Sequence, residues 1–114
     1  MATSRVRRGR SSEEAVAQFL RDHGWPSAER VPASIKGADI VKGIAGVAIE
    51  VKARRSFDPV AFFRQAKKNA RGAELPVVVM RPDGAGEASV GKWLVFTTLE
   101  EFVDLVKEAG YGDE

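Results

Sequence analysis

Hydrophobic and polar positions alternate along residues 47–52 with the period of a β-strand. Three branched aliphatic residues fall on one face, and Glu50 and Lys52 fall on the other. Residues 38–42 form a second strand candidate, joined to the first by the Gly-Ile-Ala-Gly turn at 43–46. The continuous apolar run 75–80 predicts a buried central strand.

Three segments have the spacing of amphipathic helices. In the first, Ser11 is the expected N-cap, the stripe is Val16, Phe19 and Leu20, and Gly24 ends the helix. The second begins at the Asp-Pro pair 58–59, an N-cap followed by proline at the first helical position, and extends to about residue 71. The third begins at 98 with a capping box and carries a stripe of four apolar residues: Phe102, Val103, Leu105 and Val106.

Extended segments at 25–32 and 92–97 and a glycine-rich loop at 82–91 complete the chain. The predicted order is helix, three strands, helix, two strands, helix (αβββαββα). Sheets and helices bury their apolar faces in layers, so this order predicts an α/β fold with a mixed central sheet flanked by helices.

Composition narrows the class of protein. With 114 residues, 44% of them hydrophobic and 30% charged, the chain fits one globular domain. The N-terminus lacks the apolar region of a signal peptide, and no apolar stretch is long enough to cross a membrane. The absence of cysteine excludes disulfides, a thiol nucleophile and thiolate metal ligands. We therefore expect a cytoplasmic protein with a flexible basic arm at 1–10 and a single domain at 11–114.

The net charge of +2 is unevenly distributed along the chain. Residues 1–10 contain four arginines and no acid, and residues 52–71 contain seven basic residues against Asp58 alone. The segment from Thr98 onward contains six acids against Lys107. Such asymmetry indicates a positive face that attracts nucleic acid, although a solvated helix face would carry similar charges.

Asp39, Glu50 and Lys52 form the constellation that suggests chemistry. If Ile44 and Ala45 form a two-residue hairpin loop, Asp39 lies directly across from Glu50, with Cβ atoms about 5 Å apart. Charges on so apolar a strand pair are costly unless they are paired or bind a metal. The alternative is a cross-strand salt bridge on a solvated sheet face.

Two carboxylates and a backbone carbonyl, here that of Val51, suit a hard cation such as Mg²⁺, with Mn²⁺ as a substitute. Such a metal polarises a phosphate and lowers the pKa of a bound water. Lys52 beside it can orient or deprotonate that water and stabilise the developing charge. Phosphodiester hydrolysis is the reaction that this set of residues fits best.

The pair Gly37-Ala38-Asp39-Ile40 and, ten residues on, Ile49-Glu50-Val51-Lys52 resembles the core motif of the PD-(D/E)XK nuclease superfamily. Within it, the layout over residues 13–81 is similar to the archaeal-type Holliday junction resolvases. Ala38 stands where the motif's name places proline. The resemblance implies a restriction-endonuclease-like core, Mg²⁺-dependent cleavage of branched DNA in recombination and repair, and a homodimer.

The resemblance also implies further site residues. A metal-associated glutamate belongs on the first helix, and Glu13 is preferred over Glu14 because it shares the inward stripe of Val16 and Leu20. An exposed helix-start glutamate favoured by the helix dipole is the alternative. Ser34 would lie near the scissile phosphate, Arg30 would support the site, and Gln65 would support the water or metal. Each of these three also fits an ordinary solvent-facing residue.

The sequence thus predicts a structure-selective DNA endonuclease. The alternatives are a nuclease of the same fold that acts on flaps, nicks or single-strand ends, and a DNA-binding module without catalysis. Phosphate contacts are expected from ten basic residues: Arg5, Arg7, Arg8, Arg10, Arg30, Arg54, Arg55, Arg64, Lys67 and Lys68.

Overall fold

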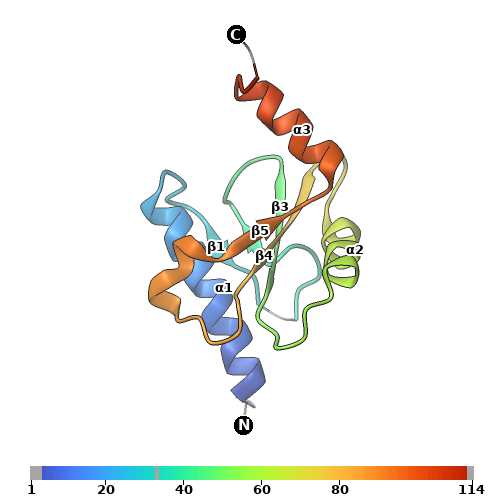
Figure 1. Ribbon diagram of the computed structural model, residues 1–114. Coiled ribbons are helices and arrows are strands. Elements are labelled where there is room, and N and C mark those ends of the chain that lie inside the picture. Colours follow the sequence, from blue (N-terminus) through green and yellow to red (C-terminus); the bar gives the residue numbers. More distant parts are fainter. Residues whose placement is uncertain (1–3, 33, 113–114) are drawn as a thin grey trace.

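The computed structural model describes residues 4–32 and 34–112, except for the side chains of residues 4 and 5. A five-stranded mixed sheet in the order β1-β2-β3-β4-β5 is flanked by helices (Figure 1), which confirms the predicted α/β class with a mixed central sheet. The strands are β1 Glu29–Arg30, β2 Ile40–Val41, β3 Val47–Lys52, β4 Leu75–Met80 and β5 Leu94–Phe96. The helices are α1 Ser4–Asp22, α2 Pro59–Asn69, α3 Leu99–Glu108 and a short 3₁₀ helix, η1 Glu87–Lys92.

The β2–β3 pairing has the register that the sequence predicts. Ile40 is the partner of Ile49, which places Asp39 level with Glu50. The connection is longer than the expected two-residue loop, because the chain leaves the strand geometry after Val41. Lys42 adopts a φ of 55°, and the turn closes where Val47 N donates to Ile44 O over 3.1 Å. β3 and β4 run parallel over six residue pairs, with α2 as the crossover between them.

Each face of the sheet is covered by one helix, so hydrophobic cores form on both sides (Figure 1). On one face, the stripe of α1 packs on the odd-numbered residues of β3 and β4. On the other, Phe62 and Ala66 of α2 pack on Val78 and Met80. Since Glu50 pairs with Val78 and Lys52 with Met80 in the sheet, both charged side chains of β3 project toward α2.

The first helix begins at Ser4, not at Ser11 as expected. The hydroxyls of Ser11 and Ser12 bond backward to the carbonyl of Arg8, over 3.2 and 2.6 Å, instead of capping the amides that follow. Both serines therefore lie inside the helix and do not mark its start. Residues 4–10, expected in a flexible arm, form its first turns, and residues 1–3 lie outside the described part.

The starts of the other two helices agree with their sequence signals. Asp58 caps α2 by accepting from Ala61 N over 3.1 Å, and Thr98 caps α3 by accepting from Glu101 N over 3.3 Å. α2 ends at Asn69, two residues before the expected end. α3 buries none of its residues, and three of the four residues of its apolar stripe, Phe102, Val103 and Leu105, are exposed as the helix projects from the sheet (Figure 1).

The remaining boundaries are shorter than expected. Only Glu29 and Arg30 of segment 25–32 pair as β1, and β5 covers only the middle of segment 92–97. The expected loop at 82–91 contains most of η1. Among the helices of the described residues, none has the length and apolarity that crossing a membrane requires.

Candidate active site

Asp39 reaches its position through the hairpin that pairs β2 with β3. Its backbone N–H donates to Ile49 O over 2.9 Å, and its side-chain Oδ2 accepts from the backbone N–H of Val51 over 2.7 Å. Both hydrogen bonds join Asp39 to β3, so its carboxylate is turned toward that strand. Burial raises the pKa of Asp39, although the bond from Val51 opposes that shift.

Glu50 is the most deeply buried acid of the site, with a side chain only 3% exposed. Burial, and then the negative charge of Asp39, raise its pKa to about 7. One carboxyl oxygen, Oε1, accepts from Asn69 over 3.4 Å and lies 4.0 Å from Lys52 Nζ. The other oxygen, Oε2, is buried and accepts no hydrogen bond while both acids are ionised. When one acid is protonated, the carboxyls of Asp39 and Glu50 hydrogen-bond to each other. Burying such an acceptor is costly unless a proton or a ligand satisfies it.

Lys52 lies two residues beyond Glu50, on the same face of β3. Its ammonium donates to Gln65 Oε1 on α2 and lies 5.6 Å from the centre of the Phe62 ring. The residue is 7% exposed. A cation that is held by an amide, an aromatic face and a nearby carboxylate keeps one orientation, which is a requirement for a group that acts on a bound water.

The donor set fits a hard divalent cation. Two neighbouring carboxyl groups, both with pKa values raised by burial and one with an unpartnered buried oxygen, gain from a shared positive charge. Asp39 and Glu50 are the residues that would hold it. The carbonyl of Val51 stays a prediction, since the contacts described for Val51 involve its N–H.

Glu13 lies close to the site without joining a ligand cluster. Its carboxylate pairs with Arg30 over 3.5 Å. Burial and the charge of Asp39 raise its pKa, which Arg30 and Lys52 oppose. Within residues 4–32 and 34–112, no three acids, histidines or cysteines gather as a metal-holding group. The structure therefore places Glu13 beside the carboxylate pair from α1, with Arg30 as its partner.

The other predicted residues are those expected to support the site and those expected to contact DNA. Gln65 contacts Lys52, as a supporting residue would. Ser34 is exposed on the turn before Gly37. The side chain of Arg5 lies outside the described residues. Seven of the predicted DNA-contacting residues are exposed: Arg7 and Arg10 on α1, Arg54 and Arg55 after β3, and Arg64, Lys67 and Lys68 on α2. Arg8 and Arg30 are half-buried.

Asn69 is the contact residue that sequence reasoning missed. It stands four residues after Gln65, so both face the same strand from one side of α2. That i, i+4 spacing of two amides was the available signal. Asn69 also lines a hollow of about 380 Å³ beside β2, together with Lys36 and Arg71.

Comparison with known proteins adds no relative. No family model matches the chain, and no curated protein or solved structure matches it either. Function is therefore inferred from the geometry of the site and from the motif that the sequence carries.

Proposed function

We propose that this chain is a metal-dependent nuclease that hydrolyses phosphodiester bonds of DNA. One observation carries the proposal: Asp39 and Glu50 lie together beside Lys52, with Glu50 Oε2 buried and unpartnered. The spacing of these three residues in the PD-(D/E)XK-like motif supports the same interpretation.

In this proposal, Asp39 and Glu50 would hold Mg²⁺ or Mn²⁺, and the chemistry supplied by such a cation would be polarisation of the scissile phosphate and a lowered pKa of a water. Lys52 orients the attacking water and stabilises the negative charge that develops on the phosphate. Gln65 holds the Lys52 ammonium in that orientation, and Asn69 does the same for Glu50 Oε1. Their amide groups make these contacts without adding a charge to the site.

The proposed substrate is branched DNA, with the four-way junction first among the candidates. The resemblance of residues 13–81 to the archaeal-type resolvases supports this choice. Exposed basic residues on α1, after β3 and on α2 offer contacts to several phosphates. We propose a homodimer because resolving a junction requires two symmetric cuts.

The test is cleavage of a labelled four-way junction and of its matching linear duplex, in Mg²⁺ and in EDTA. We expect paired nicks near the junction that require metal and disappear in Glu50→Gln. Equal cutting of junction and duplex would remove the resolvase proposal while keeping the nuclease. Cutting confined to flaps, nicks or single-strand ends would assign one of those substrates.

A DNA-binding module without catalysis is the second candidate. The burial of Glu50 and Lys52, 4.0 Å apart, favours it, because a structural ion pair has the same appearance. This candidate requires tight junction binding in Mg²⁺ and in Mn²⁺ with the DNA left intact. Any metal-dependent cut that Glu50→Gln abolishes would exclude it.

A further inference from the structure

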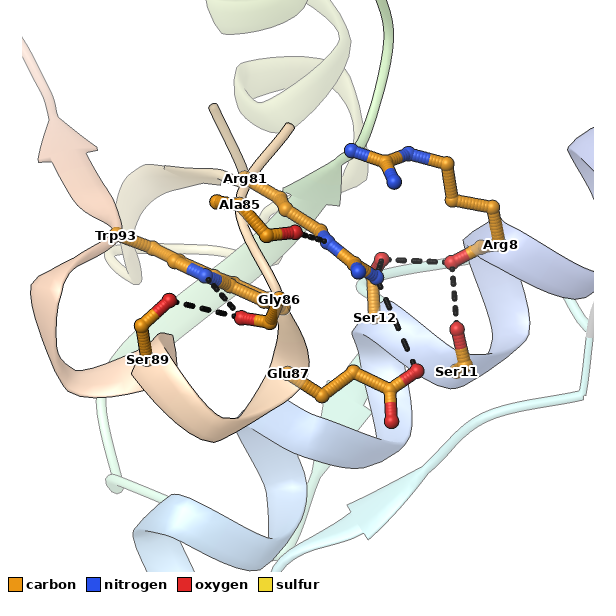
Figure 2. Close-up of polar contacts among 9 residues, drawn as sticks. All are labelled: Arg8, Ser11, Ser12, Arg81, Ala85, Gly86, Glu87, Ser89 and Trp93. Carbon is orange, nitrogen blue, oxygen red and sulfur yellow. Dashed lines mark hydrogen bonds and ion pairs between the residues drawn. The ribbon is translucent and has the colours of Figure 1, made fainter. Parts of the chain in front are cut away.

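Arg81 is a buried arginine that the proposed chemistry does not use. It directly follows β4 and is 8% exposed. Its guanidinium donates from Nε to the carbonyl of Ala85 over 2.8 Å and from Nη1 to Ser12 Oγ over 3.0 Å (Figure 2). It also lies 5.2 Å from the Trp93 ring. One side chain thus joins α1, the loop after β4 and the segment that follows η1.

Burying the charge of Arg81 costs free energy, which the partners of its guanidinium must offset. Burial and the positive charge of Arg8 lower the pKa of Arg81. The nearest carboxylate, that of Glu87, is 3.9 Å away and 53% exposed, which makes it a weak counter-ion. The contact with Ser12 is shielded from solvent, unlike that with Glu87, since Ser12 is fully buried and its hydrogen bond to Arg81 is buried as well.

The backbone and the side chain of Arg81 each contact a residue at or next to the candidate site. Its backbone N–H donates to the carbonyl of Lys52 over 2.8 Å, which extends the β3–β4 ladder by one bond. Its side chain fixes Ser12, the residue directly before Glu13 on α1. The same residue therefore sets the end of the strand that carries Lys52 and the turn of α1 that carries Glu13.

We propose that Arg81 is a positioning residue that holds Glu13 in register with Asp39 and Lys52. The inference rests on the proposed function, because it gives Glu13 a part in binding the metal or its water. Arg81 itself touches neither carboxylate. It acts through Ser12, whose hydroxyl also donates to the Arg8 carbonyl over 2.6 Å and so locks the helix turn before Glu13.

Two adjacent serines provide a matched test. Ser11 and Ser12 both bond to the carbonyl of Arg8, but only Ser12 accepts from Arg81. Ser12→Ala removes the Arg81 contact with little change in volume, and Ser11→Ala is its control. Arg81→Gln removes the guanidinium itself. If Arg81→Gln fails to fold, Ser12→Ala still provides the test.

The readout is Mn²⁺ affinity without DNA, measured from the electron paramagnetic resonance signal of free Mn²⁺. We expect Ser12→Ala to weaken binding about tenfold, as loss of an outer support of a metal ligand does. Ser11→Ala should stay within about twofold of the wild type, the range of ordinary surface changes. Combined with Glu13→Gln, Ser12→Ala should add no further loss, because both act through the same carboxylate.

Equal Mn²⁺ affinity in Ser12→Ala and Ser11→Ala would overturn the role of Arg81. So would a double variant, Ser12→Ala with Glu13→Gln, whose loss of Mn²⁺ affinity is the product of the two single losses. Junction cleavage by the wild type is measured in parallel. A wild type that binds Mn²⁺ and cuts no DNA would refute the nuclease proposal, while the comparison of the two serines still decides on Arg81. A wild type that binds no Mn²⁺ would refute both.

Discussion

Asp39 and Glu50 stand level across the β2–β3 hairpin, one residue beyond the pair formed by Ile40 and Ile49. The backbone N–H of Val51 holds the first carboxylate, and Asn69 holds the second. Neither acid can turn away from the other without losing its hydrogen bond. The repulsion between them is therefore built into the fold, and it should appear in the stability of the protein as well as in its chemistry.

In metal-free protein, the free energy of unfolding should fall as the pH rises from about 4.5 to about 7. The folded protein keeps a proton on Glu50 over this range that the unfolded chain has already lost, so raising the pH favours unfolding. Each unit of difference in pKa contributes about 1.4 kcal/mol. Urea denaturation in EDTA at pH 5 and pH 8 measures it. Glu50→Gln should flatten the dependence, and a wild type that gains stability over this range would contradict the pairing.

A divalent cation should restore the stability that is lost at high pH. At pH 8, Mn²⁺ at 100 times its dissociation constant should raise the free energy of unfolding by about 2.7 kcal/mol, since it binds the folded state alone. Asp39→Asn should abolish the increase. Thermal unfolding with and without Mn²⁺ is the measurement, and Asp58→Asn, which changes an exposed acid at the start of α2, is the control. An equal response in both variants would place the cation elsewhere.

Lys52→Met should reduce cleavage by a factor of about 10² to 10⁴ and leave junction binding nearly intact. Methionine keeps an unbranched apolar side chain over Phe62, one atom shorter than lysine, but carries no ionisable proton or charge. Single-turnover rates at saturating enzyme separate the chemical step from binding. If binding and folding were lost together with cleavage, Lys52 would belong to a structural ion pair with Glu50.

Gln65→Ala should lower the cleavage rate about tenfold without weakening DNA binding, because the Lys52 ammonium loses the side-chain oxygen that holds it in place. Lys67→Ala, on the same helix and exposed, should do the reverse and weaken binding alone. Rates and dissociation constants for the two variants, measured side by side, test the division of roles along α2. Identical behaviour of the two would refute it.

Replacing Arg7 and Arg10 by glutamine should weaken DNA binding and reduce the slope of log affinity against log salt by about two, because each arginine would neutralise one phosphate. Both residues are exposed on the first turns of α1. These substitutions preserve the helix, whereas deletion of residues 1–10 would also remove the Arg8 carbonyl that Ser12 bonds. An unchanged slope would mean that this end of α1 does not contact DNA.

The candidate site was predictable where it depends on local geometry. The strand period of two places Lys52 on the same face as Glu50. The register that sets Asp39 against Glu50 was also predicted correctly, although the connection is longer than the two-residue loop assumed. The helix caps at Asp58 and Thr98 are similarly local. Signals of this kind involve residues a few positions apart, and the chain alone determines them.

Contacts between distant elements were not predictable in the same way. Asn69 meets Glu50 only because α2 docks with one particular rotation about its axis. The start of α1 was misplaced because Ser11 and Ser12 have the sequence signature of caps, while the burial of Ser12 against Arg81 depends on a contact across 69 positions. An arginine is ordinarily expected at the surface, so nothing local indicates that Arg81 is buried.

The parallel pairing of β3 with β4 has a consequence for how the protein folds. Partners in this ladder, such as Val47 and Leu75, are joined only through the α2 crossover. Pairing of this kind must close a long loop before any bond is gained, so it is slow to form. Lys52 lies on the first strand of the crossover, and its partner Gln65 lies on the helix. Because that helix is itself the crossover, we expect the polar cluster to be held in place only once β3 and β4 have paired, and a collapsed chain without that pairing to lack the site.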